Sequence, residues 1–137
     1  AIDEMQRFLD YFPNSERAKQ AQDIIFELQD KLVYKELLNA QLYYNLGNYM
    51  GNNYQSAIIT AQNALKEYPY TRYKETLSML ILKSKYQEAV QSIEEKKPER
   101  FRDVIDEYYS FINDYPSGEY SNIWKHRFKV ANKYVKD

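Results

Sequence analysis

The stretch Ala64-Leu65-Lys66-Glu67-Tyr68-Pro69-Tyr70-Thr71 decides how this chain folds, because variants of it occur three times. The other two copies are FLDYFPNS at residues 8–15 and FINDYPSG at residues 111–118. Each copy begins with two apolar residues and reaches an aromatic residue, a proline and then a serine or threonine. A phrase that recurs at wide intervals is typical of a repeat architecture. The sequence therefore predicts a stack of helical hairpins.

The proline of each copy is expected to end one helix and begin a turn. Proline cannot continue a helix, and it disfavours helical backbone in the residue before it. A hydroxyl shortly after the proline can accept hydrogen bonds from the free N–H groups of the next helix. The expected repeat turns lie near residues 12–15, 68–71 and 115–118, around Pro13, Pro69 and Pro116. The expected caps are Asn14 and Ser15, Thr71, and Ser117.

Between these turns, the spacing of apolar residues predicts helices along the whole chain. They are expected at residues 1–11, 16 to about 49, 54–68, 70 to about 97, 99–115 and 119 to about 135. Pro98 fits the first position of the fifth helix, where its missing N–H costs nothing. The expected fold is an all-α, α-α solenoid with elongated helices. It forms a single helical-repeat domain over residues 1–137, with about three repeats.

The second of these helices is long, because residues 16–46 contain neither proline nor glycine. Its apolar stripe shifts by one residue near the middle, which is about 100° around the helix axis. The first half carries Ala18, Ala21, Ile25, Leu28 and Leu32. The second half carries Val33, Leu37, Ala40 and Tyr44, joined by Tyr34, Leu38, Leu42 and Leu46. We therefore expect this helix to pack against one hairpin with its first half and against the next with its second.

Composition argues against several classes of function. The chain has 19 Lys and Arg against 20 Asp and Glu, a formal net charge of −1, which favours neither nucleic acid nor an anionic membrane as a partner. It has no cysteine, so disulfides and thiolate sites are absent from this sequence. His126 is the only histidine, and no phosphate-binding loop or nucleophile motif occurs. The sequence predicts a non-enzymatic protein with no cofactor, no metal site and no catalytic residue.

Two features carry alternative interpretations. The chain has 15 tyrosines, whose rings either fill the seams between helices or form a contact surface for a partner. The last expected helix is basic, with Lys125, Arg127, Lys129, Lys133 and Lys136. This charge belongs either to a solvated outer face of a terminal helix or to a docking site for an acidic partner domain.

One segment resembles the second half of a tetratricopeptide repeat. Tyr54, Ala57, Ala64 and Pro69 match the pattern of that repeat, whereas Leu46-Gly47 lies two residues closer to Tyr54 than the pattern requires. The three repeat prolines are 56 and 47 residues apart, against about 34 residues in the common repeat. Both excesses fit longer helices between otherwise ordinary turns.

Long-helix repeats with such turns resemble the BamD family of lipoproteins in the β-barrel assembly machinery. The resemblance rests on Tyr68-Pro69-Tyr70-Thr71-Arg72-Tyr73, on residues 115–120, and on residues 31–37 followed by Ala40, Tyr43 and Tyr44. It implies the C-terminal repeats of a longer protein, on the periplasmic face of the outer membrane, held there by a lipid anchor outside this sequence. Richness in Tyr, Asn and Lys is typical of a Bacteroidetes-type source.

By this resemblance, we expect a scaffold for the assembly and insertion of β-barrel proteins into the outer membrane. The implied partners are a periplasmic domain of the barrel insertase, other assembly lipoproteins and unfolded barrel substrates. The alternative is a generic tetratricopeptide adaptor that binds peptide tails, although Lys31, Lys35 and Asn39 are spread along one helix and form no clear clamp. The expected contact surface is an aromatic and amide region formed by Tyr43, Tyr44, Asn48, Tyr49, Asn52 and Asn53.

Overall fold

The computed structural model describes residues 2–116 and 121–135, although for residues 121–123 only the backbone. Within these residues it has six α-helices and no strand. The helices are α1 Ile2–Tyr11, α2 Glu16–Leu46, α3 Asn53–Glu67, α4 Lys74–Val90, α5 Lys97–Asp114 and α6 Ser121–Val135. The expected all-α fold is thus confirmed.

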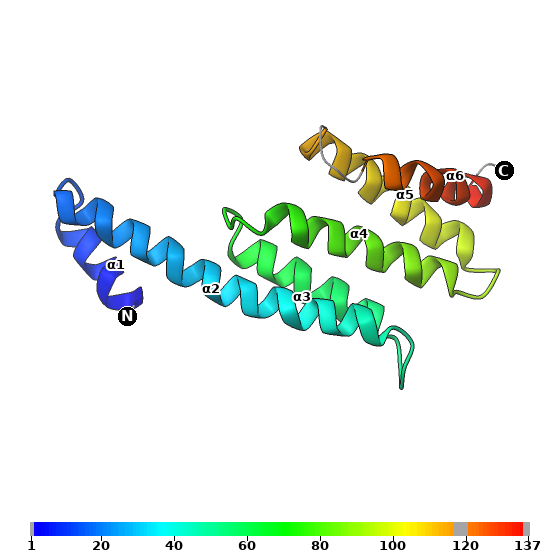
Figure 1. Cartoon of the computed structure of the whole chain (residues 1–137), viewed down its shortest axis with the longest axis horizontal. Helices are drawn as coiled ribbons and strands as arrows, with labels where there is room; N and C mark the ends of the chain where they lie inside the picture. Colours follow the sequence, from blue (N-terminus) through cyan, green and yellow to red (C-terminus); the bar gives the residue numbers. More distant parts are fainter. Residues whose placement is uncertain (1, 117–120, 136–137) are drawn as a thin grey trace.

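The helices pack in chain order, each against the next, and α2 also contacts α4. Figure 1 shows α1 folded back beside the first half of α2, while α3 and α4 lie beside its second half. The two ends of the chain lie at opposite ends of an elongated molecule (Figure 1). The arrangement is a repeat-like stack of antiparallel helices, and α2 contacts a hairpin partner along each half, as its shifted stripe predicted.

The length of α2 follows from where its two ends are closed. Ser15 caps the first turn, because its hydroxyl accepts a hydrogen bond from the Ala18 amide at 3.0 Å. Gly47 closes the other end with a φ of +56°, a backbone conformation that favours glycine. A Cβ at this position would lie 2.8 Å from the Tyr54 hydroxyl. Between these caps, 31 residues form one helix about 46 Å long.

The cap expected at Thr71 is wrong. The Thr71 hydroxyl donates a hydrogen bond to the Asp30 carboxylate at 2.6 Å and accepts one from the Tyr73 amide at 3.3 Å. α4 begins only at Lys74, and its N-cap Tyr73 makes no side-chain capping bond. The turn is therefore held by α2 rather than by a local cap, and the helix starts later than residue 70. The cap expected at Ser117 lies outside the described residues.

α4 also ends earlier than expected, at Val90 rather than near residue 97. A helix running on through Pro98 would lack one backbone hydrogen bond, and the proline ring would clash with the preceding turn. The Ser92 hydroxyl instead donates to the Glu88 carbonyl at 2.6 Å and accepts from Arg100 at 3.0 Å. These bonds stabilise the connection to α5, which carries Pro98 in its first turn, as expected.

Two hydrophobic clusters form the core, and both include residues of α4. The first cluster joins α2, α3 and α4 and contains Val33, Leu37, Ala40, Ile58, Ala61, Ala64, Leu77, Leu80 and Ile81. The second joins α4, α5 and α6 and contains Met79, Leu82, Ala89, Phe101, Val104, Phe111, Trp124 and Ala131. Small residues let α2 and α3 approach closely in the first cluster, whereas rings fill the second.

Part of the expected apolar stripe on α2 is not covered. Leu38, Leu42 and Leu46 are 47%, 57% and 40% exposed, and Leu32 and Tyr34 are also exposed. Val33, Leu37 and Ala40 are buried, as expected. Only part of the apolar stripe in this half therefore lies in the core. The second half of α2 packs on α3 and α4 with one side. On the other side, Leu38, Leu42 and Leu46 are exposed, and we call these three residues the leucine row.

Candidate binding surface

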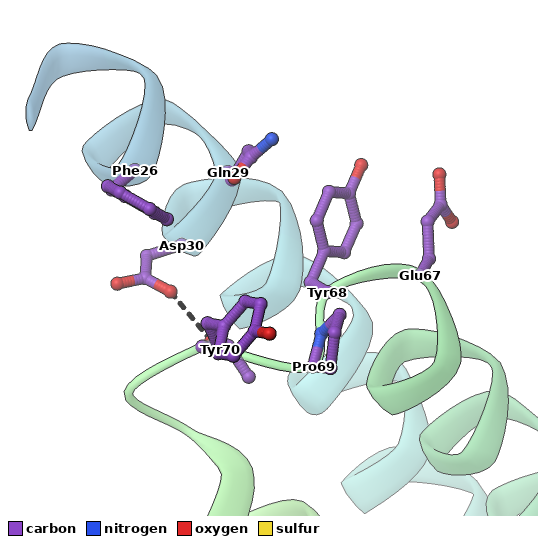
Figure 2. Close-up of a pocket in the computed structure, with 8 residues that line it drawn as sticks. Phe26, Gln29, Asp30, Glu67, Tyr68, Pro69 and Tyr70 are labelled. Atoms are coloured by element: carbon purple, nitrogen blue, oxygen red, sulfur yellow. Dashed lines mark hydrogen bonds between the residues drawn. The ribbon is translucent and has the colours of Figure 1, made fainter. Parts of the chain in front are cut away.

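The second repeat turn forms a pocket against α2 (Figure 2). The pocket is lined by Phe26, Gln29 and Asp30 of α2, by Glu67, and by the turn residues Tyr68, Pro69, Tyr70 and Thr71. Its volume is about 200 Å³. Figure 2 shows the Asp30 carboxylate directed at the turn, with the hydrogen bond to Thr71 drawn as a dashed line.

Asp30 is fully engaged in holding this turn. Besides Thr71, it accepts a hydrogen bond from the Arg72 guanidinium at 2.9 Å and another from the Arg72 amide at 3.4 Å. Burial by itself raises the pKa of Asp30, but the bonds from Thr71 and Arg72 together lower it below its ordinary value. The carboxylate therefore stays charged and paired. We interpret this pocket as a structural joint between α2 and the α3–α4 turn.

A different surface is formed where α4 meets α6. The Trp124 indole is buried and donates a hydrogen bond to the Met79 sulfur at 3.2 Å. The edge of the Tyr86 ring packs against Trp124, with ring centroids 5.6 Å apart. On the α2 side, the half-buried Tyr44 makes an edge contact with Tyr54 at 5.7 Å. Ring contacts thus join α4 to α6 and α2 to α3.

Two cations lie over these rings. The Lys83 ammonium is 4.8 Å from the centroid of the Tyr44 ring. The Arg127 guanidinium is 4.9 Å from the Trp124 ring and 5.4 Å from the Tyr86 ring. Both cationic side chains are half-buried. Attraction between a cation and a ring face contributes about 0.5–2 kcal/mol, depending on how far the pair is removed from water.

Neither cation has a carboxylate partner within the described part of the chain. The ion pairs found there are Arg72–Asp30, Lys85–Glu107, Lys97–Glu94 and Arg100–Glu88. Burial, and then the nearby positive charge of Arg127, lowers the pKa of Lys83 below its ordinary value of 10.5. Lys83 and Arg127 therefore repel each other, and the rings hold them without neutralising their charge. We call Lys83, Arg127 and the rings of Tyr44, Tyr86 and Trp124 the cation–ring cluster.

The residues expected to form a contact surface have different roles. Tyr44 belongs to the cation–ring cluster and packs against the first core cluster. Asn52 caps α3 by accepting a hydrogen bond from the Gln55 amide at 3.2 Å, and its amide group donates to Glu88. The Asn53 side chain donates to the Tyr49 carbonyl at 2.7 Å and thereby closes the loop between α2 and α3.

The remaining expected contact residues are exposed. Tyr43 and Tyr49 are 37% and 69% exposed, and Asn48 is also exposed. These three residues lie in the last turn of α2 and the loop after it. They stay a predicted contact surface, while Asn52 and Asn53 have identifiable structural roles.

Two residues of the cation–ring cluster were assigned differently from sequence. Lys83 has no predicted role from sequence, and Arg127 is one of several charges on the basic last helix. On that helix, Lys125, Lys129 and Lys133 are exposed, whereas Arg127 turns toward the rings; Lys136 lies outside the described residues. The basic helix was a usable signal for Arg127, but nothing local marked Lys83 as its neighbour.

Metal sites and membrane-spanning helices are absent from the described residues. Across residues 2–116 and 121–135, no three His, Cys, Asp or Glu side chains are grouped so that they could hold a metal ion. None of the helices in these ranges is long and apolar enough to span a membrane. Models of known protein families give no match to this chain. A search of curated proteins likewise finds no significant match.

Proposed function

We propose that this chain is a non-enzymatic, protein-binding scaffold that acts in the assembly and insertion of β-barrel proteins into the outer membrane. The observation that carries the binding role is the large apolar and aromatic surface left exposed by an ordered helical stack. It includes Tyr49 and Met50 at 69% and 90% exposure, together with the leucine row. Exposed apolar surface of this extent is typical of proteins that bind other proteins.

The placement in outer-membrane assembly rests on the repeat turn and on the helix lengths. The turn at residues 68–73 resembles that of the BamD family, and α2 is long enough to serve two hairpins. Under this proposal the partners are a periplasmic domain of the barrel insertase, other lipoproteins of the machinery and unfolded barrel segments. An extended helical stack offers such partners a continuous surface without any rearrangement of its own core.

The proposal can be tested with purified periplasmic domains of the barrel insertase from the source organism. These domains would be immobilised, and binding of the chain would be measured by biolayer interferometry. We expect reversible binding that weakens in Tyr43→Ser plus Tyr49→Ser. The matched control is Tyr70→Ser, which removes an exposed ring at the other end of α3.

The outcomes separate the function from the site. No binding by the unmodified chain would count against a role in outer-membrane assembly. Binding that is equally strong in the double variant would remove Tyr43 and Tyr49 from the interface and leave the function standing.

The generic peptide-binding adaptor remains the second proposal, because the cation–ring cluster favours it. Two cations on neighbouring helices of a repeat stack resemble a receptor for an acidic peptide more than a packing device. If the chain binds short peptides but none of the periplasmic insertase domains, we would adopt this second function.

A further inference from the structure

The cation–ring cluster places two positive charges together at a middle position of the fold. Lys83 lies at the midpoint of α4, and Arg127 lies near the midpoint of α6. Neither side chain is at an exposed helix end, where water would screen it fully. Each is half-buried against rings that fix its position.

Such an arrangement is unfavourable for the protein alone. Two like charges near each other repel, and partial burial strengthens this repulsion because less water lies between them. Partly buried charges in proteins are normally paired with an opposite charge. Lys83 and Arg127 form no ion pair in the part of the chain that the structure describes. Their positive charge is thus not offset by an ion pair within those residues.

We propose that Lys83 and Arg127 together bind the side-chain carboxylate of an Asp or Glu in a polypeptide partner that crosses α4 and α6. This inference rests on the proposed protein-binding function and names the chemistry of its partner. A guanidinium binds a carboxylate through two parallel hydrogen bonds, and the Lys83 ammonium adds a second charge to the same group. The half-buried rings of Tyr44 and Tyr86 offer apolar contact to the neighbouring residue of the partner.

The side-chain carboxylate of an internal residue fits this position better than the carboxylate at the C-terminus of a peptide. The pair lies midway along two helices, so a polypeptide that crosses it continues on both sides of the bound residue. The partner's acidic residue would thus be internal, with an aromatic or apolar neighbour.

The test uses a displayed library of random peptides of about twelve residues, held between flexible flanks so that no peptide has a free C-terminus. The library is selected on the unmodified chain and on Lys83→Gln plus Arg127→Gln. Lys125→Gln plus Lys129→Gln is the matched control, because it removes the same charge from exposed positions. We expect the unmodified chain and the control to enrich Asp or Glu at one fixed position beside an aromatic residue.

Selected peptides are then synthesised and titrated in solution. Trp124 is the only tryptophan and lies beneath Arg127, so its fluorescence reports directly on this site. We expect binding to weaken about tenfold or more in the double glutamine variant and to change less than about twofold in the control. The conservative variant Arg127→Lys should retain part of the affinity, which a purely structural role for Arg127 would not predict. Circular dichroism of each variant checks that it is folded.

Three results would overturn the inference. One is that the unmodified chain enriches peptides with no preference for Asp or Glu at any position. Another is equal binding by the double glutamine variant. The third is a requirement for a free C-terminus, shown by a second library that has one. None of these affects binding of the insertase domains, so the proposed function is judged separately by that experiment. If neither peptides nor insertase domains bind, both proposals fail.

Discussion

The two core clusters, on opposite sides of α4, solve the same packing problem with different residues. In the first cluster, Ala61 and Ala64 of α3 are almost fully buried, so α3 lies close to its neighbours. In the second, Phe101 and Trp124 are almost fully buried, and rings fill the space between α5 and α6. Close packing of small residues brings the backbones of α2 and α3 together. Packing of rings leaves polar edges and ring faces at the rim, and this is where Arg127 lies.

Among the substitutions considered below, loss of a ring from the second cluster should therefore destabilise the fold most. Trp124→Ala removes a side chain that is 2% exposed and also its hydrogen bond to Met79. We expect a loss of about 3–5 kcal/mol in the free energy of unfolding. Urea denaturation followed by circular dichroism measures it, with Lys125→Ala as the exposed control on the same helix. A loss below about 1 kcal/mol would show that the rings do not form a tightly packed core.

A larger side chain in the first cluster should lower the free energy of unfolding by less than Trp124→Ala does. Ala61 is fully buried where α3 packs in the first cluster, so Ala61→Leu forces the neighbouring helices to move. We expect a loss of about 1–3 kcal/mol. The control is Gln62→Leu, at the next position, which is exposed. If both variants unfold at the same urea concentration, the small residues are not what sets the helix spacing.

The stability of the fold at high pH should depend on the buried tyrosine hydroxyls of both clusters. Burial raises the pKa of Tyr44 and Tyr68 at the first cluster, and of Tyr86, Tyr108 and Tyr115 at the second. Above pH 10.0, the ordinary pKa of tyrosine, the unfolded chain releases these protons before the folded chain does. The stabilising contribution of the tyrosines is complete below pH 10.0 and declines as pH rises toward the folded-state values.

Lys83 changes the stability of the fold with pH in the opposite direction to the tyrosines. The pKa of Lys83 in the folded chain lies below the ordinary 10.5. The charged ammonium therefore destabilises the fold at lower pH, and this destabilisation decreases as pH rises toward 10.5. Since five tyrosines oppose one lysine, we expect a net loss of stability above pH 10. Urea midpoints between pH 9 and 11 measure this loss, and Tyr86→Phe plus Tyr108→Phe should reduce it. A midpoint that does not change with pH would contradict the burial of these hydroxyls.

The smallest effect is expected on α4, the helix that both clusters share. The Ser84 hydroxyl is fully buried and has no hydrogen-bond partner among the residues that the structure describes. Ser84→Ala removes a polar group that gains nothing from the fold, so we expect a gain of up to about 1 kcal/mol. Thermal unfolding by calorimetry is the measurement. Destabilisation by this change would show that the hydroxyl has a partner in solution.

Local signals in the sequence predicted the backbone well. The repeat prolines and the absence of Pro and Gly between them predicted α2, and Ser15 caps it as expected. Thr71 does not cap α4, because the helix begins only at Lys74 and the Thr71 hydroxyl accepts from the Tyr73 amide within the turn. Asp30, 41 residues earlier in the chain, accepts hydrogen bonds from both Thr71 and Arg72 and holds them in the turn. No local pattern contains that contact.

The candidate site could be predicted only in part. The basic last helix marked Arg127, and Tyr44 was among the expected contact residues. Lys83 was not predicted, because no local pattern in the sequence distinguishes it. The meeting of Lys83 with Arg127 depends on how α4 and α6 pack, which the sequence does not encode locally. The leucine row was misjudged because periodicity identifies an apolar side but not what covers it.

The continuous course of α2 also has a mechanical consequence. α1 packs on its first half, and α3 and α4 pack on its second half, so this one helix joins two separate packing units. No glycine or proline interrupts it between Glu16 and Leu46, and a helix without such breaks resists bending. A force or displacement applied at α1 is therefore transmitted along about 46 Å of stiff helix to the loop at Gly47. The helix thus fixes the distance between the turn at Ser15 and the loop at Gly47.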